Sequence, residues 1–197
     1  MRIFLAGVLG GLALFVWLSV AHILTPLGET GIEEIPNEQA VTSALKGNIT
    51  HSGMYLFPGW GLPPDATHSQ KMEAMKNMAP KIAAGPTGIL VFHQTGEVMT
   101  GRQLGTEFIT NVVQIFLGAF LLAQTSIRRY ISKLGFFLVL GIVAAISTNI
   151  SYWNWYGFPA SYTCAYIFTE VVGYLAAGLV VAAIVKRGAA QASAAGA

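Results

Sequence analysis

The chain has 197 residues, of which 54% are hydrophobic and only 10% are charged, whereas about 25% of residues are charged in an average soluble domain. Its single cysteine, Cys164, excludes an intrachain disulfide and a cysteine-based zinc site. The net charge of +2 conceals an uneven distribution, because all the acids except Glu170 lie between Glu29 and Glu107. This composition favours an integral membrane protein over a soluble domain.

Four long apolar stretches cover residues 3–24, 108–125, 134–150 and 162–185. A helix of about 17 residues or more, at a rise of about 1.5 Å per residue, is long enough to cross a hydrocarbon core of about 30 Å. The start of the first stretch, with Ser19-Val20-Ala21, also resembles a cleavable signal peptide. The apolar run continues through Leu24, which favours an uncleaved membrane anchor.

The basic residues outside the first long loop predict the orientation. They are Arg2, Arg128, Arg129, Lys133, Lys186 and Arg187. Cytoplasmic loops carry the excess of Lys and Arg, so we expect both termini and the turn between the second and third stretches in the cytoplasm. The long acidic loop and the turn at residues 151–159 then face the periplasm, across the inner membrane of a bacterium.

We therefore expect an all-α transmembrane protein, a four-helix bundle with a small α+β extracytoplasmic cap between its first two helices. The expected divisions are a first helix at 1–26, a cap at 27–100, three further membrane helices at 101–187 and a disordered tail at 188–197. The small residues of Gly7-x-x-x-Gly11, and of similar pairs in the third and fourth stretches, allow helices to pack closely.

The cap sequence predicts two helices and two strands. One helix follows Asn37 and continues through Lys46, and strands are expected at 51–57 and 88–93. A second helix, capped by Asp65 or Thr67, is expected to end near Gly85. Thr100 with Gln103 fits a capping box, so the second membrane helix is expected to start before the bilayer.

Glu170 is the strongest candidate for a functional residue. A charge at the centre of a membrane helix costs about 2.5–3.5 kcal/mol on insertion scales. The candidate partners are polar groups on the neighbouring helices: Asn111, Gln114, Thr148 and Asn149, with Tyr166, Thr169 and Tyr174 on the same helix. Glu170 is then either a proton-relay or ligand-binding carboxyl, or a protonated group that joins helices by hydrogen bonds.

A second candidate site lies in the cap. His51 and His93 fall on the two predicted strands, and antiparallel pairing would bring their imidazoles side by side. Met72, Met75 and Met78 lie between them at a spacing of three that resembles the extracellular methionine motifs of copper transporters, where thioethers select Cu(I). The alternative is that the methionines form an apolar helix face. A haem is not expected, because His22 has no second axial ligand at its depth.

The segment from Tyr152 to Pro159 is the densest aromatic run of the chain. Trp153, Trp155 and Tyr156 are candidates for binding a quinone, a lipid or a partner subunit. The simpler interpretation is an interfacial turn, in which Gly157 bends the chain and Pro159 starts the fourth helix.

Three motifs carry a resemblance. The first is His51-Ser52-Gly53 with Tyr55 and Phe57-Pro58-Gly59, the second is Pro86-Thr87-Gly88 with His93, and the third is the aromatic run from Tyr152 to Pro159. Together they resemble a family of uncharacterised small inner-membrane proteins of bacteria. The resemblance implies a bacterial setting and four membrane spans. It implies no activity and no catalytic residues.

These features favour a non-catalytic accessory or binding subunit of a larger membrane complex, one that is respiratory or otherwise energy-coupled. Its expected partners are the lipid bilayer and other membrane protein subunits, and no nucleic acid. The alternative is a small carrier or sensor, proton-coupled through Glu170 or copper-linked through His51 and His93. An enzyme is the weakest reading, because no nucleophile–base pair is recognisable.

Overall fold

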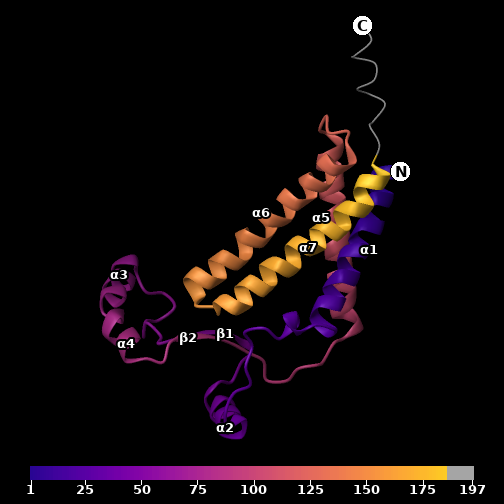
Figure 1. Ribbon diagram of the computed structural model, residues 1–197. Coiled ribbons are helices and arrows are strands. Elements are labelled where there is room, and N and C mark those ends of the chain that lie inside the picture. Colours follow the sequence, from indigo (N-terminus) through magenta and orange to yellow (C-terminus); the bar gives the residue numbers. More distant parts are fainter. Residues whose placement is uncertain (186–197) are drawn as a thin grey trace. The chain divides into compact units, whose positions relative to one another are not determined.

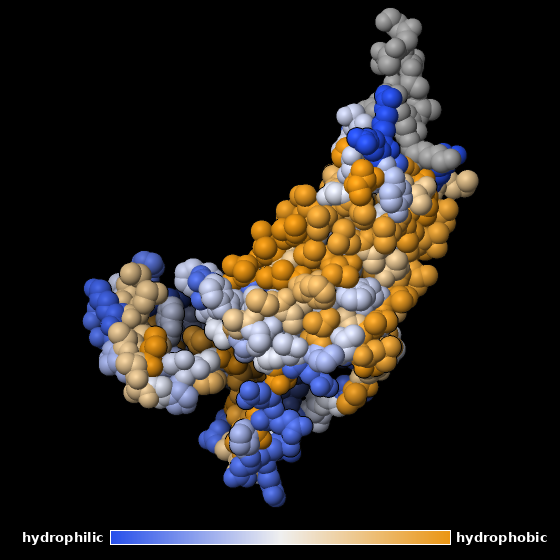
Figure 2. All heavy atoms as spheres, in the orientation of Figure 1, coloured by the Kyte–Doolittle hydropathy of each residue, from blue (hydrophilic) through white to orange (hydrophobic). Residues whose placement is uncertain are grey.

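The computed structural model describes residues 1–185, so Lys186, Arg187 and the expected disordered tail at 188–197 lie outside the described part. Four helices, α1 (Arg2–Ile23), α5 (Gly101–Ala123), α6 (Tyr130–Tyr156) and α7 (Ala160–Ile184), are long and apolar enough to cross a membrane. Their outward side chains are largely apolar and form a continuous hydrophobic surface (Figure 2). The protein is therefore a multi-pass membrane protein.

The chain divides into two compact units, one of Met1–Glu33 with the chain from Val98 on, and one of Glu34–Glu97. The second unit is narrower than the cap expected at 27–100. Residues after α1 belong to the membrane unit because the short 3-10 helix η1 (Pro26–Gly28) and Gly31 pack on α7. Gly31 has a φ of +79°, and a Cβ there would lie 2.7 Å from the Tyr162 backbone nitrogen.

Helix α1 packs along both α5 and α7 (Figure 1). The Gly7-x-x-x-Gly11 face lies against α5: a Cβ on Gly11 would stand 2.5 Å from Val112 Cα, and one on Gly7 would stand 2.7 Å from Phe116 Cβ. The absence of side chains at these glycines lets the two backbones approach closely. This close-packing face is thus used within the chain.

Helix α6 packs along α7 through two further glycines. A Cβ on Gly141 would lie 2.6 Å from Tyr174 Cβ, and one on Gly178 would lie 2.7 Å from Phe137 Cβ. Helix α5 approaches α6 mainly around Gly118, beside Phe137. The helices therefore lie in the contact order α5, α1, α7, α6, and α5 is separated from α7 over much of its length.

The first turn of α6 meets the end of α7. The Tyr130 hydroxyl donates to the Leu179 carbonyl at 3.0 Å, and Lys133 Nζ donates to the Val185 carbonyl at 2.6 Å. A lysine at this position satisfies carbonyls that α7 leaves open at its C-terminus. Because α1 runs antiparallel to both α5 and α7, Arg2 lies at the same end of the unit as Lys133.

The second membrane helix begins as the sequence predicts. Thr100 accepts a hydrogen bond from the Gln103 backbone N–H, and the Gln103 side chain accepts from the Thr100 backbone N–H, which completes the capping box. The aromatic turn differs from the prediction. Helix α6 continues through Tyr156, so Trp153 and Trp155 lie in its last turns, and only Gly157 to Pro159 form the connection to α7.

The Glu34–Glu97 unit contains α2 (Glu38–Asn48), β1 (Gly53–Phe57), α3 (His68–Lys76), α4 (Met78–Ala84) and β2 (Gly88–Phe92). The two strands pair antiparallel, from Gly53 opposite Phe92 to Phe57 opposite Gly88. Thr67 caps α3 as expected. The single helix expected to end near Gly85 is wrong, however, because Asn77 separates α3 from α4.

Candidate functional site

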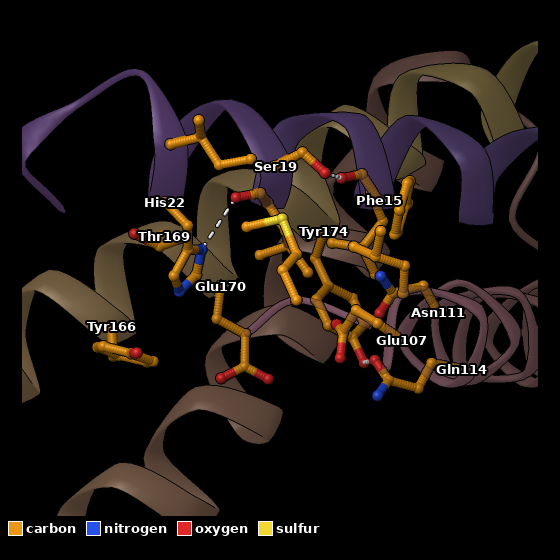
Figure 3. A pocket seen from close by; sticks show the side chains of 15 residues that line it. Phe15, Ser19, His22, Glu107, Asn111, Gln114, Tyr166, Thr169, Glu170 and Tyr174 are labelled. Atoms are coloured by element: carbon orange, nitrogen blue, oxygen red, sulfur yellow. Dashed lines mark hydrogen bonds between the residues drawn. The ribbon is translucent and has the colours of Figure 1, made fainter. Parts of the chain in front are cut away.

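A cavity of about 460 Å³ lies between α1, α5 and α7 in the membrane unit (Figure 3). Its lining comes mainly from residues 14–23 of α1, 104–114 of α5 and 166–174 of α7, away from the close contact around Gly118. Apolar groups form much of its lining, among them Leu14, Leu18 and Leu104. A concave, mostly apolar space of this size with a few polar groups is typical of small-molecule sites.

Helix α1 supplies Phe15, Ser19 and His22 to the cavity. The Ser19 hydroxyl donates a hydrogen bond to the Phe15 carbonyl at 2.9 Å. His22 Nδ1 lies 2.9 Å from the Leu18 carbonyl, which can only accept, so Nδ1 carries a proton. The His22 ring also contacts Tyr166 edge-on, with ring centroids 5.6 Å apart.

Helix α5 supplies Glu107, Asn111 and Gln114, whose spacing of four and three residues places them on one face. Asn111 is only 2% exposed, and its Nδ2 has no hydrogen-bond partner among the described residues. A buried amide donor without a partner costs about 1–3 kcal/mol. Asn111 is therefore a donor that an occupant of the cavity could satisfy.

Helix α7 supplies Tyr166, Glu170 and Tyr174, again at a spacing of four residues. The Tyr174 hydroxyl donates to Gln114 Oε1 at 3.2 Å, which joins α7 to α5 across the cavity. In Figure 3, Glu170 lies between Tyr166 with His22 on one side and Tyr174 with Gln114 on the other. Its carboxyl points away from these groups, towards Asn149 of α6.

Glu170 has only one protein donor in the described part of the chain. Asn149 Nδ2 donates to Glu170 Oε2 at 3.5 Å, and the same Nδ2 donates to the Ala145 carbonyl at the shorter distance of 2.9 Å. The second carboxyl, Glu107, is exposed near α5's first turns. No Lys or Arg belongs to the described lining of the cavity, so its two carboxyl groups have no strongly basic side chain beside them.

The structure brings Glu170, Asn111 and Gln114 to one cavity and places Asn149 behind Glu170. Sequence reasoning missed Glu107, which it counted with the loop acids. The predicted start of the helix at Thr100 could have identified it, because Glu107, Asn111 and Gln114 then share a face. The sequence does not place His22 in this site either, because its position beside Tyr166 depends on how α1 packs on α7.

An aromatic row connects the end of α6 to the cavity. Tyr152 stacks on Phe158 at 5.3 Å, Phe158 meets Tyr162 at 5.4 Å, and Tyr162 stacks on Tyr166 at 4.2 Å. The expected binding residues Trp153, Trp155 and Tyr156 are 48%, 79% and 50% exposed, and they do not line the cavity. The aromatic segment is thus connected to the cavity through Tyr152 and Phe158, and not through the predicted binding residues.

The residues predicted to bind copper do not lie together at one site. The strand register, continued by two residues, sets His93 opposite Ser52 and His51 opposite Gln94, which places the two histidines on opposite faces. Met72 and Met75 are exposed on α3, whereas Met78 is buried at the start of α4. Residues 1–185 contain no group of three His, Cys, Asp or Glu that could hold a metal ion. Copper binding stays a prediction.

Comparison with known proteins finds no family model, no curated protein and no solved structure that matches the chain. The resemblance to small bacterial inner-membrane proteins therefore stays a prediction. The function has to be argued from the cavity itself.

Proposed function

We propose that this protein is a non-catalytic binding protein of the bacterial inner membrane, which takes a small amphiphilic ligand into the cavity between α1, α5 and α7. The observation that carries this proposal is the Glu170 carboxyl, which lies near the midpoint of a membrane helix and lines an open volume. Intramembrane ionisable residues that face a cavity are typical of ligand and ion sites.

The alternative, that Glu170 only joins helices, explains less. A structural carboxyl is expected to be saturated by short hydrogen bonds from neighbouring helices. Glu170 receives one long bond, from an amide nitrogen that also donates to a backbone carbonyl. The unpartnered Asn111 amide lines the same space. Two polar groups with unused hydrogen-bonding capacity favour an occupant over a purely structural role.

The proposal includes an orientation, with the termini in the cytoplasm and the Glu34–Glu97 unit in the periplasm, as part of a bundle with a cap. The basic end of the membrane unit supports it. In a Cys164→Ser background, a thiol at Ser69 on α3 should react with a membrane-impermeant maleimide added to intact spheroplasts. A thiol at Ser126, between α5 and α6, should react only after lysis. The reverse pattern would invert the topology.

The cavity itself can be tested with a second pair of thiols in the same background. Ser19→Cys should react with a water-soluble maleimide, because Ser19 lines the cavity and thiolates react in water. Val20→Cys is the matched control, since Val20 lies at nearly the same depth and follows Leu12 and Val16, both lipid-exposed, at helical spacing. We expect at least about tenfold faster labelling at position 19. Equal rates would count against an open cavity.

A second candidate function is an accessory subunit that docks onto a larger membrane complex. The exposed Trp153 and Trp155 at the end of α6 favour it, because tryptophan is enriched at interfaces. The glycine faces do not add support for docking, since helices of the same chain already pack against them. These glycines are Gly7, Gly11, Gly141 and Gly178. Purification from native membranes separates the two candidates, because only docking requires a protein partner in fixed ratio.

A further inference from the structure

We propose that the ligand of this cavity is an organic cation with an apolar body and one hydrogen-bond acceptor, for which Glu170 is the counter-ion. This inference rests on the proposed binding function and adds the chemical class of the ligand. It is carried by three independent features: the sign of the charge, the aromatic walls and the unpartnered Asn111 donor.

The charge of the lining selects a cation. Two acidic residues, Glu107 and Glu170, belong to the lining of the cavity, and its described lining contains no Lys or Arg to neutralise them. An unpaired carboxylate in a region of low dielectric is costly, and a bound cation removes that cost. An anionic ligand would instead add repulsion. A bare metal ion is disfavoured, because the described residues lack a set of three ligating His, Cys, Asp or Glu.

The side chains that line the cavity suit an organic cation, such as a quaternary ammonium compound, rather than the small inorganic ion NH₄⁺. Phe15, Tyr166 and Tyr174 line the cavity on two sides of Glu170, and leucines complete it. Aromatic faces attract quaternary ammonium groups by about 0.5–2 kcal/mol, depending on desolvation. The leucines require that the remainder of the ligand be apolar, because burial of apolar surface supplies most of the binding free energy.

The amide of Asn111 specifies the third part of the ligand. Asn111 lines the cavity, and its buried Nδ2 donates to no described protein atom. Gln114, on the same face, has its Oε1 engaged by the Tyr174 hydroxyl. An acceptor oxygen on the ligand, such as an ester or ketone carbonyl, would satisfy the Asn111 donor and recover the free energy of desolvation.

Benzoylcholine and its neutral isostere 3,3-dimethylbutyl benzoate test this inference. Both have a phenyl ring and an ester carbonyl, and they differ only in the nitrogen that carries the charge. The measurement is tritiated benzoylcholine binding to the full-length protein in lipid nanodiscs, with and without the unlabelled isostere as competitor. We expect saturable binding of the cation and at least about tenfold weaker competition by the isostere.

Three variants test how much Glu170, Glu107 and Asn111 each contribute to binding. Glu170→Gln keeps the size of the side chain and should weaken binding at least about tenfold, whereas Glu107→Gln, at the exposed carboxyl, should weaken it less. Asn111→Leu removes the donor and should weaken binding of benzoylcholine by about five- to tenfold. Fluorescence-detected size exclusion of each variant verifies that the protein remains folded.

Acid should weaken binding, because protonation of a carboxyl removes its attraction for a cation and benzoylcholine keeps its charge at every pH. The titratable groups that face the cavity are His22, Glu107, Tyr166, Glu170 and Tyr174. In Glu170→Gln the dependence on pH should be smaller than in the wild type.

The outcomes separate the class of ligand from the binding function. Equal binding of the cation and the isostere, or no effect of Glu170→Gln, would overturn the cation assignment while leaving an occupied cavity. Absence of benzoylcholine binding would also overturn it, and labelling at Ser19→Cys then decides separately whether the cavity is open.

Discussion

The Gly11→Ile variant is expected to lose the packing of α1 against α5 and, with it, most of the ordered fold in mild detergent. A Cβ at position 11 would stand 2.5 Å from Val112 Cα, which is a backbone atom and has no rotamer by which to move away. Overpacking of a core typically costs about 1–3 kcal/mol, and a clash with backbone belongs at or above the upper end of that range. The measurement is thermal unfolding followed by tryptophan fluorescence.

Leu12→Ile is the matched control for this variant. It introduces the same side chain one residue further along α1, where Leu12 is 43% exposed on the lipid-facing side. Its unfolding temperature should stay close to that of the wild type. If Gly11→Ile also unfolded at the wild-type temperature, the close approach of α1 and α5 would not be a determinant of the fold.

The sequence predicts the helices well because lipid restricts what can cross it. A segment without water must satisfy its backbone hydrogen bonds internally, so a long apolar stretch can only be a helix. The ends are harder to predict from hydropathy. Helices α5 and α6 extend beyond their apolar stretches, to Gly101 and to Tyr156. Only the capping box at Thr100 marks one of these extensions in the sequence.

The candidate site could be predicted in part. Glu170 is identified by its cost in an apolar helix, and the amides on α5 are its natural partners. The sequence does not place Glu107 and His22 in the site, because their positions there depend on which faces of the helices meet. Glycine spacing indicates that α1 packs closely on a neighbour, but the spacing does not identify α5 as that neighbour. The position of His22 beside Tyr166 follows from that pairing.

The two histidines of the cap show a limit of strand prediction. Each strand was expected at nearly its correct position, and antiparallel pairing was expected too. The face on which a side chain lies depends on the register, and a shift of one residue reverses it. Here the register pairs Met54 with Val91, so His51 and His93 fall on opposite faces.

Phe137→Ala is expected to destabilise the protein by about 3–5 kcal/mol while leaving the affinity of the folded fraction for benzoylcholine unchanged. Phe137 is fully buried, and it fills the space beside Gly178 of α7 and Gly118 of α5. Its removal leaves a cavity that glycine neighbours cannot fill. Phe136→Ala, at a half-buried ring on the same helix, should cost clearly less.

The unchanged affinity follows from where Phe137 lies. The proposed ligand site is lined by residues of α1, α5 and α7 and the segment before α5, and no residue of α6 belongs to its described lining. Unfolding temperatures and benzoylcholine isotherms measured on the same nanodisc samples test both parts. A large loss of affinity in Phe137→Ala, at equal folded fraction, would show that α6 controls the spacing of α5 and α7 around the site. In that case the site could not be treated as independent of the packing that closes the opposite end.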